Sequence, residues 1–206
     1  MTPTTLSIGS PSGRPSSSNE LLNAIASDVR SDIFAHLENM HLSVREVLYH
    51  QGQRIPYVYF PTSSAVSLMS VMDEGRSVEI ASVGREGLVG AAAVFGEDVA
   101  MARAIVQVPG EALRMESASF REVLKAQRSF REIVERYLYV LLVTVARSGG
   151  CNALHTVEQR CARWLLSMHD RTNTDQFVLT QEFLAEMLES VAHVSMSWPA
   201  RSSAQG

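Results

Sequence analysis

The spacing of hydrophobic residues changes twice along the chain. Between Glu20 and Met40 apolar side chains recur at helical spacing, which predicts one or two short helices. Between Leu42 and Met115 short apolar runs alternate with turn residues, and from Ser117 to Ser148 the helical spacing returns. The pattern therefore predicts a group of strands that short helices precede and a long helix follows.

Six short apolar runs make up the middle part of the chain. They are residues 44–49, 57–60, 65–72, 77–83, 104–108 and 112–115. Gly52 and Gly110 mark turns, and residues 73–76 read as a hairpin loop in which we expect Gly75 to take a positive φ. Many short strands at this spacing predict a sandwich or a barrel, because βαβ units would place a helix between successive strands.

The long helix has a broad apolar face that contains a heptad seam. The seam consists of Val134, Leu138, Leu141 and Val145. One interpretation places this face on the strands, and the other pairs the seam with its copy in a second chain; the width of the face allows both. Gly149 and Gly150 then predict a hinge or a helix end, because two glycines destabilise a helix by about 1–2 kcal/mol relative to two alanines.

Further helices are predicted after the two glycines. Thr156 and Gln159 have the spacing of a capping box and begin a new amphipathic helix. We expect another helix at residues 181–188 and a further one at residues 192–198, which Pro199 would end. Two short helices joined by a turn of about three residues form the helix-turn-helix unit that reads DNA.

Composition narrows the class of protein. Of the 206 residues, 46% are hydrophobic and 19% are charged, which supports a folded core, and the net charge of −4 excludes a strongly basic nucleic-acid coat. Residues 1–19 are rich in Ser, Thr, Pro and Gly, so we expect a disordered tail there. The two cysteines, Cys151 and Cys161, suit a reducing cytoplasm.

Signatures of enzymes, metal sites and membrane spans are absent from the sequence. It has no G-x-S-x-G, H-E-x-x-H or P-loop motif, so we expect no catalytic residue, no metal ion and no cofactor. The apolar run 137–146 lies between two arginines and is far shorter than the roughly 20 residues that cross a bilayer. We therefore expect a soluble cytoplasmic protein without a membrane partner.

The glycine-rich stretch from Gly84 to Gly90 is a candidate binding site. Gly84, Gly87 and Gly90 would let backbone N–H groups approach an anion, and Arg103 would supply the countercharge. The alternative is an ordinary loop between two strands, because glycines are common in such turns.

Four stretches carry a resemblance to a known family. They are residues 47–52, 84–95, 154–166 and 179–188. Taken in this order, they resemble the Crp/Fnr family of bacterial transcription regulators. The resemblance implies an α+β fold with a cyclic-nucleotide-binding-like β-roll (a jelly roll), flanking helices, a homodimer built on the long helix, and a winged helix-turn-helix.

The resemblance also divides the chain. It implies a β-roll at residues 20–116 after the disordered tail 1–19, a dimerisation helix at 117–150, and a partial helix-turn-helix domain at 151–206. Members of the family that bind cAMP place a Glu against the ribose and an Arg-Ser pair against the phosphate. Here Ala91 takes the place of the Glu, and Ala104 follows Arg103. We therefore expect a small anionic effector other than cAMP, or no effector.

The C-terminal part departs further from the family. The family's β-wing is missing, as if the chain were truncated or shifted in frame, and residues 147–206 hold five Arg, no Lys and six Asp or Glu, a net charge of −1. Thr180 and Gln181 would contact phosphate, and His193 and Ser195 would read bases. Without a basic footprint we expect weak DNA binding.

Two functions remain open at this point. The first is a Crp/Fnr-type DNA-binding transcription regulator that senses a small effector through its β-roll. The second is a dimeric sensor or interaction module that has lost specific DNA binding.

Overall fold

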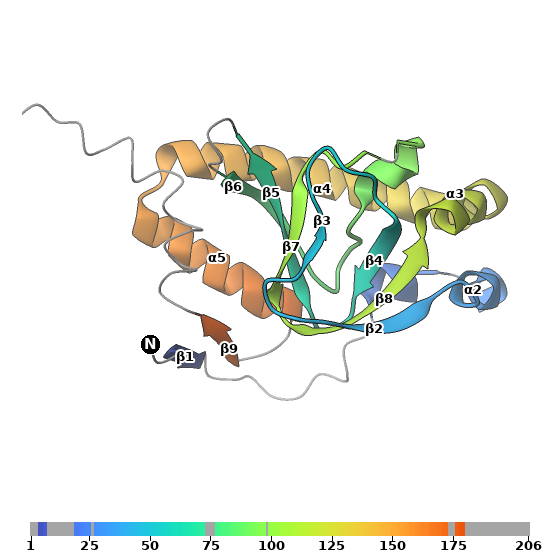
Figure 1. Cartoon of the computed structure of the whole chain (residues 1–206), viewed down its shortest axis with the longest axis horizontal. Coiled ribbons are helices and arrows are strands. Elements are labelled where there is room, and N and C mark those ends of the chain that lie inside the picture. The colour runs from blue at the N-terminus through green and yellow to red at the C-terminus, as the bar shows by residue number, and fades with distance from the viewer. Residues whose placement is uncertain are drawn as a thin grey trace, which may run out of the picture.

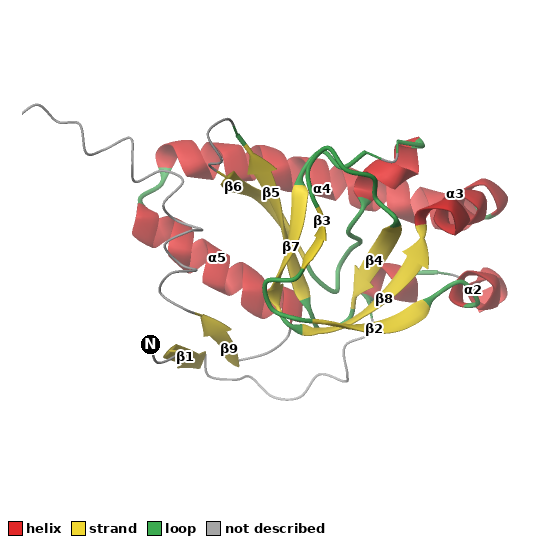
Figure 2. Cartoon of the chain, in the orientation of Figure 1, coloured by secondary structure: helices red, strands yellow, loops and turns green. Residues whose placement is uncertain are grey.

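A computed structural model describes residues 4–7, 19–25, 27–72, 77–97, 99–172 and 176–179 of the chain. Most of the strands gather in the middle of the molecule with helices around them, and a separate pair of strands lies near the N-terminus (Figure 2). The described part is therefore a mixed helix and sheet fold of the kind that the sequence predicts.

Seven antiparallel strands form the two sheets of a β-roll (Figure 1). One sheet has the order β2 (Glu38–Leu42), β8 (Gly110–Glu116) and β4 (Tyr57–Pro61). The other has the order β3 (Val47–Tyr49), β7 (Arg103–Val108), β5 (Ala65–Val71) and β6 (Ser77–Val83). Each of the six predicted apolar runs overlaps one of these strands, so the predicted roll is confirmed.

Two short helices precede the roll, as predicted, but they end earlier than the predicted segment. They are α1 (Glu20–Asn23) and α2 (Ser27–Phe34). The rest of the segment enters β2, whose residues alternate poorly because only Leu42 is buried. A strand that exposes most of its side chains gives little hydrophobic signal, which is why it was missed.

Part of the segment predicted to be disordered is a strand. β1 (Thr4–Ser7) pairs antiparallel with β9 (Gln176–Leu179), with Thr4 opposite Leu179. The partner strand lies at the other end of the sequence, so local composition gave no sign of the pairing. The remaining residues of the 1–19 segment lie outside the described part, apart from Asn19.

The long helical segment consists of two helices. α3 (Ser117–Ala126) and α4 (Arg128–Leu154) meet at Gln127, whose backbone leaves the helical region (φ −114°, ψ 88°). The predicted hinge at Gly149 and Gly150 is wrong, because α4 continues through both glycines to Leu154. The packing of the rest of this helix outweighs the helix propensity that the two glycines lose.

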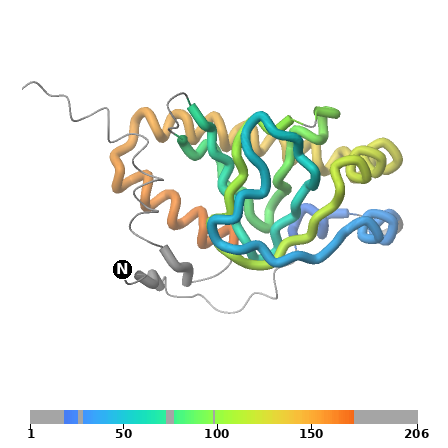
Figure 3. The backbone as a smooth tube through the Cα atoms, in the orientation of Figure 1, coloured from blue at the N-terminus to red at the C-terminus, as the bar shows by residue number. Residues whose placement is uncertain are grey.

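α4 runs along the roll, and α5 (Val157–Thr172) turns back beside it (Figures 1 and 3). The predicted capping box is confirmed: the Gln159 N–H donates to the Thr156 hydroxyl at 3.4 Å, and the Thr156 N–H donates to the Gln159 side-chain oxygen at 3.0 Å. No described helix is both long enough and apolar enough to cross a membrane.

The predicted seam on α4 packs largely inside the chain. Val134 is 0% exposed, and Leu138 packs against the same cluster as the rings of Phe60, Phe120 and Phe130. Leu141 packs against a second group of buried apolar residues, which includes Tyr49 and Val66 of the roll. Val134 is therefore buried within its own chain, as expected if this face of α4 packs on the roll rather than on a second chain. The large apolar side chains that α4 exposes are others: Tyr139, Val140, Leu142 and, at its end, Leu154.

Candidate functional site

The glycine loop joins β6 to a short 3-10 helix, η2 (Ala91–Phe95). Several of its backbone N–H groups have partners within the chain. The Gly84 N–H donates to the Glu86 carboxylate at 3.2 Å, and the Gly87 N–H donates to the Gly84 carbonyl at 3.1 Å. The Val89 N–H donates to the Tyr59 carbonyl at 2.8 Å. These donors are therefore already engaged where the sequence predicted an anion.

Gly90 adopts the left-handed conformation (φ 104°) at the start of η2. The hydroxyl of the buried Tyr49 is hydrogen-bonded to the Gly90 backbone. Burial raises the pKa of Tyr49 well above its ordinary value, so the hydroxyl is neutral in the physiological range. A neutral side chain of the protein itself is thus hydrogen-bonded to the backbone at Gly90.

Gly84 and Gly87 allow two helices to approach the loop closely. A Cβ atom on Gly87 would lie 2.2 Å from the ring of Tyr137 in α4, and one on Gly84 would lie 2.4 Å from the Cβ of Arg171 in α5. The Tyr137 hydroxyl donates to the Leu88 carbonyl at 3.1 Å, which fixes the ring against the loop. Both glycines are required, but for helix packing.

The charged side chains of the loop are paired with charges of the chain. Arg85 forms an ion pair with Glu20 of α1 at 3.1 Å, and Glu86 forms one with Arg171 at 3.0 Å. The buried Asn19 side chain donates to the Gly87 carbonyl at 2.8 Å. The loop therefore connects α1, α4 and α5, and it presents a carboxylate of its own.

Arg103 belongs to another element, β7. It is the first residue of β7, where it pairs in register with Met69 of β5, and it is half-buried. None of the loop contacts described above involves Arg103. Ala91, where a nucleotide-binding relative would place its carboxylate, is in η2 and offers only a methyl group.

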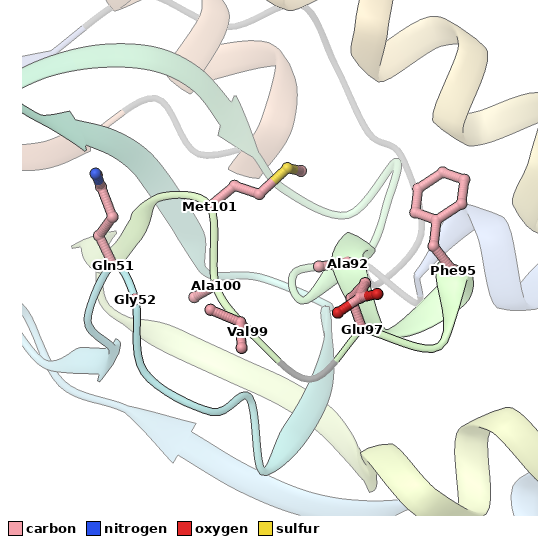
Figure 4. Close-up of a pocket in the computed structure, with 8 residues that line it drawn as sticks. All are labelled: Gln51, Gly52, Ala92, Phe95, Glu97, Val99, Ala100 and Met101. Carbon is pink, nitrogen blue, oxygen red and sulfur yellow. The ribbon is translucent and has the colours of Figure 1, made fainter.

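A cavity of about 400 Å³ opens beside η2, between the turn at Gln51 and a wall formed by Glu97 and residues 99–101 (Figure 4). Phe95 and Met101, which are 70% and 74% exposed, lie at its edge. The Gln51 amide is tied to the backbone of Val71 by two hydrogen bonds, at 2.8 and 3.2 Å, and Glu97 adds a carboxylate. The lining of this cavity contains no cation.

Sequence reasoning missed this cavity. The residues that line it are Gln51, Gly52, Ala92, Phe95, Glu97, Val99, Ala100 and Met101. None of the four predicted ligand residues is among them. The only signal in the sequence was a group of apolar residues after the glycine stretch that follows neither a helical nor a strand period.

The predicted DNA contacts, Thr180, Gln181, His193 and Ser195, lie outside the described residues, as does the hairpin loop with Gly75. Within the described ranges, no group of three or more His, Cys, Asp or Glu side chains is placed to hold a metal ion.

Comparison with known proteins identifies the domain. Residues 40–127 match the family model of the cyclic nucleotide-binding domain, whereas no curated protein matches the chain in sequence. The chain is similar in fold to the c-di-GMP responsive global regulator CLP of Xanthomonas campestris, with a TM-score of 0.63 and 16% identity over 82% of this chain and 89% of that one.

Two further structures are similar. FixK2 of Bradyrhizobium japonicum has a TM-score of 0.52 and 16% identity, over 76% of this chain and 81% of that one. A cyclic nucleotide-binding domain from Methylobacillus flagellatus has a TM-score of 0.52 and 14% identity, over 63% of this chain and 76% of that one. At such identities the likeness establishes the fold alone.

The residues present do not fit a cyclic nucleotide in the glycine loop. Such a ligand needs free N–H donors or a cation for its phosphate and an acceptor for its ribose hydroxyl. The loop donors described above are paired, Arg85 is paired with Glu20, and Ala91 has no acceptor. Residues 40–127 have the fold of a cyclic nucleotide-binding domain, but these groups of the loop are engaged within the chain.

The close packing of Gly87 on Tyr137 generates a prediction. Gly87→Ala should destabilise the chain by about 1–3 kcal/mol in urea unfolding, because the new methyl overlaps the ring. The same change should cost much less in a Tyr137→Ala background. Gly149→Ala is the matched control: nothing lies within 4 Å of its added methyl, so it should stabilise α4 by up to about 1 kcal/mol. Unchanged stability of Gly87→Ala would contradict the packing role.

Proposed function

We propose that this chain is a DNA-binding transcription regulator of the Crp/Fnr type. The observation that carries the proposal is the order of the elements: a cyclic nucleotide-binding roll, a long helix along it, and a further capped helix after it. The likeness to the regulator CLP covers 82% of the chain, far more than the matched domain at residues 40–127. It therefore includes elements beyond the roll.

The residues after α5 would supply the DNA contacts, with Thr180 and Gln181 against phosphate and His193 and Ser195 against bases. Because the charge of residues 147–206 is −1, we propose weak binding that depends strongly on salt. The same charge favours the second candidate, a dimeric sensor that no longer binds DNA specifically. DNA selection separates the two candidates.

For the effector, we propose an apolar molecule in the cavity beside η2. We place it there rather than at the glycine loop, because the hydrogen-bond donors of the loop described above and its charged side chains are paired within the chain. The cavity offers apolar side chains and a carboxylate but no cation, which disfavours an anionic ligand.

For assembly, we propose a homodimer through the exposed face of α4. Tyr139 and Leu142, three residues apart, share an exposed face of this helix, and Val140 is exposed next to Tyr139; a second copy of the chain offers the same side chains in return. Leu138, Leu141 and Val145 are half-buried beside it and would border the contact.

The DNA proposal predicts the outcome of selection from a randomised duplex pool. At low salt, a two-fold symmetric site should be enriched, with affinity that falls steeply as salt rises. Gln181→Ala should weaken binding to all sequences alike, and His193→Ala should relax selection at one base position. Ser31→Ala, at an exposed position of α2, is the control. A pool without any enriched sequence would favour the dimeric sensor.

The effector proposal predicts binding of a neutral apolar probe. N-phenyl-1-naphthylamine should bind with a rise in its fluorescence, and Met101→Gln should weaken that binding several-fold because it makes the cavity edge polar. Met72→Gln, which changes another exposed methionine outside the lining, should have no effect. Calorimetry should detect no micromolar binding of cAMP. Tight cAMP binding that Arg103→Ala abolishes would restore the glycine-loop site.

The assembly proposal predicts that Leu142→Glu yields monomers in sedimentation at tens of micromolar, because it places charges in the contact. Leu166→Glu, on the exposed side of α5, should leave the dimer intact. Leu138→Glu should lower the stability of the fold as well, since Leu138 packs on the core. An unmodified protein that sediments as a monomer would refute the proposal.

A further inference from the structure

α5 packs against the roll along one stripe of side chains. Arg160, Trp164, Met168 and Thr172 are its buried residues. They are spaced four residues apart and so lie on one face of the helix. This face meets β6 and the glycine loop, while Leu166 on the other side is exposed. Figure 3 shows the chain turning back after α4 to bring α5 alongside the strands.

A carboxylate of the roll lies beneath the middle of α5. Glu79 of β6 accepts a hydrogen bond from the Trp164 indole N–H at 3.2 Å and another from the Ser67 hydroxyl of β5. Arg163 and Arg171 of α5 act on its charge from the helix side. The nearest cation in register within the sheet is Arg103 of β7, on the far side of Met69. Glu79 therefore joins the sheet to the helix.

The end of α5 is held by the glycine loop. The Arg171 side chain pairs with Glu86 at 3.0 Å and donates to the Ser82 carbonyl at 3.0 Å. The Arg85 N–H donates to the Arg171 carbonyl at 3.3 Å, and Gly84 leaves room for the Arg171 side chain to approach. The loop that was expected to hold an anion thus holds a helix.

We propose that α5 is a latch: Glu79 and Glu86 hold it on the roll through Trp164 and Arg171, and its release frees the chain that follows. The contact between α5 and the roll stands on its own observations. Only the identity of the freed part, a DNA-binding segment, rests on the proposed function. Because Gly87 of the same loop packs on Tyr137 of α4, a movement of the loop acts on both helices together.

Protonation of Glu79 favours the state in which α5 is packed on the roll. Burial raises the pKa of Glu79, against the opposing effects of Ser67, Trp164, Arg171 and Arg163. Release of α5 would expose the carboxylate to water and return its pKa toward the ordinary value. The closed state therefore binds the proton more tightly, so the latch closes as pH falls below the raised pKa and loosens as pH rises through it.

Hydrogen exchange of the full-length protein tests the latch. In Arg171→Ala, amides of α5 should exchange about ten-fold faster or more, while amides of β2 and β8 keep their rates, because α5 opens as a local unit. Gly84→Ala should have the same effect from the loop side. Arg147→Ala, an exposed arginine of α4, is the control. Unchanged exchange in α5, or equal acceleration in β2 and β8, would overturn the proposal.

The proton effect has its own variant. Glu79→Gln keeps an acceptor for Trp164 but carries no charge, so α5 should exchange more slowly than in the unmodified protein at high pH and equally at low pH. Because amide exchange itself accelerates with pH, the two proteins are compared at each pH. A ratio that does not vary with pH would refute the proton effect. The measurement needs no DNA, so a failure of DNA binding does not affect it.

Discussion

The close approach of two helices to one loop is the constraint on which the arrangement of the described chain depends. Gly87 meets the ring of Tyr137, and Gly84 meets the Cβ of Arg171, at distances that leave no room for a side chain on either glycine. Both α4 and α5 are therefore positioned by the same few residues between β6 and η2. Asn19 and Glu20 add α1 to this junction through Gly87 and Arg85.

This junction engages groups of the glycine loop that could otherwise bind an anion. A loop of this kind can bind an anion only if its donors and its cation are free. Here Glu86 accepts from Gly84, Tyr49 is bonded at Gly90, and Arg85 is paired with Glu20. The same groups hold the elements of the chain together instead. The cavity opens beside η2, where the lining is mostly apolar.

The sequence predicted the elements better than their contacts. Short apolar runs between turn residues located six of the seven strands of the roll, because strands that are largely buried are apolar over most of their length. β2 escaped because four of its five residues are not buried, and β1 escaped because its partner is remote in sequence. The spacing of Val134, Leu138 and Leu141 showed an apolar face but did not reveal whether it packs on the roll or on a partner. In the same way, Gly84 and Gly87 indicated that something approaches the loop closely, but the sequence did not show that helices α5 and α4 do so rather than a ligand.

The pairing of β1 with β9 has a consequence for how the molecule is made. Thr4 leaves the ribosome well before its partner Leu179, which follows only after the roll, α4 and α5. Because a contact between such distant residues requires the intervening chain to be ordered first, this two-stranded sheet forms at the end of folding. During synthesis β1 is a strand without a neighbour, and an unpaired strand is an edge to which other chains can add. Its shortness, four residues of which three are Thr or Ser, limits that risk.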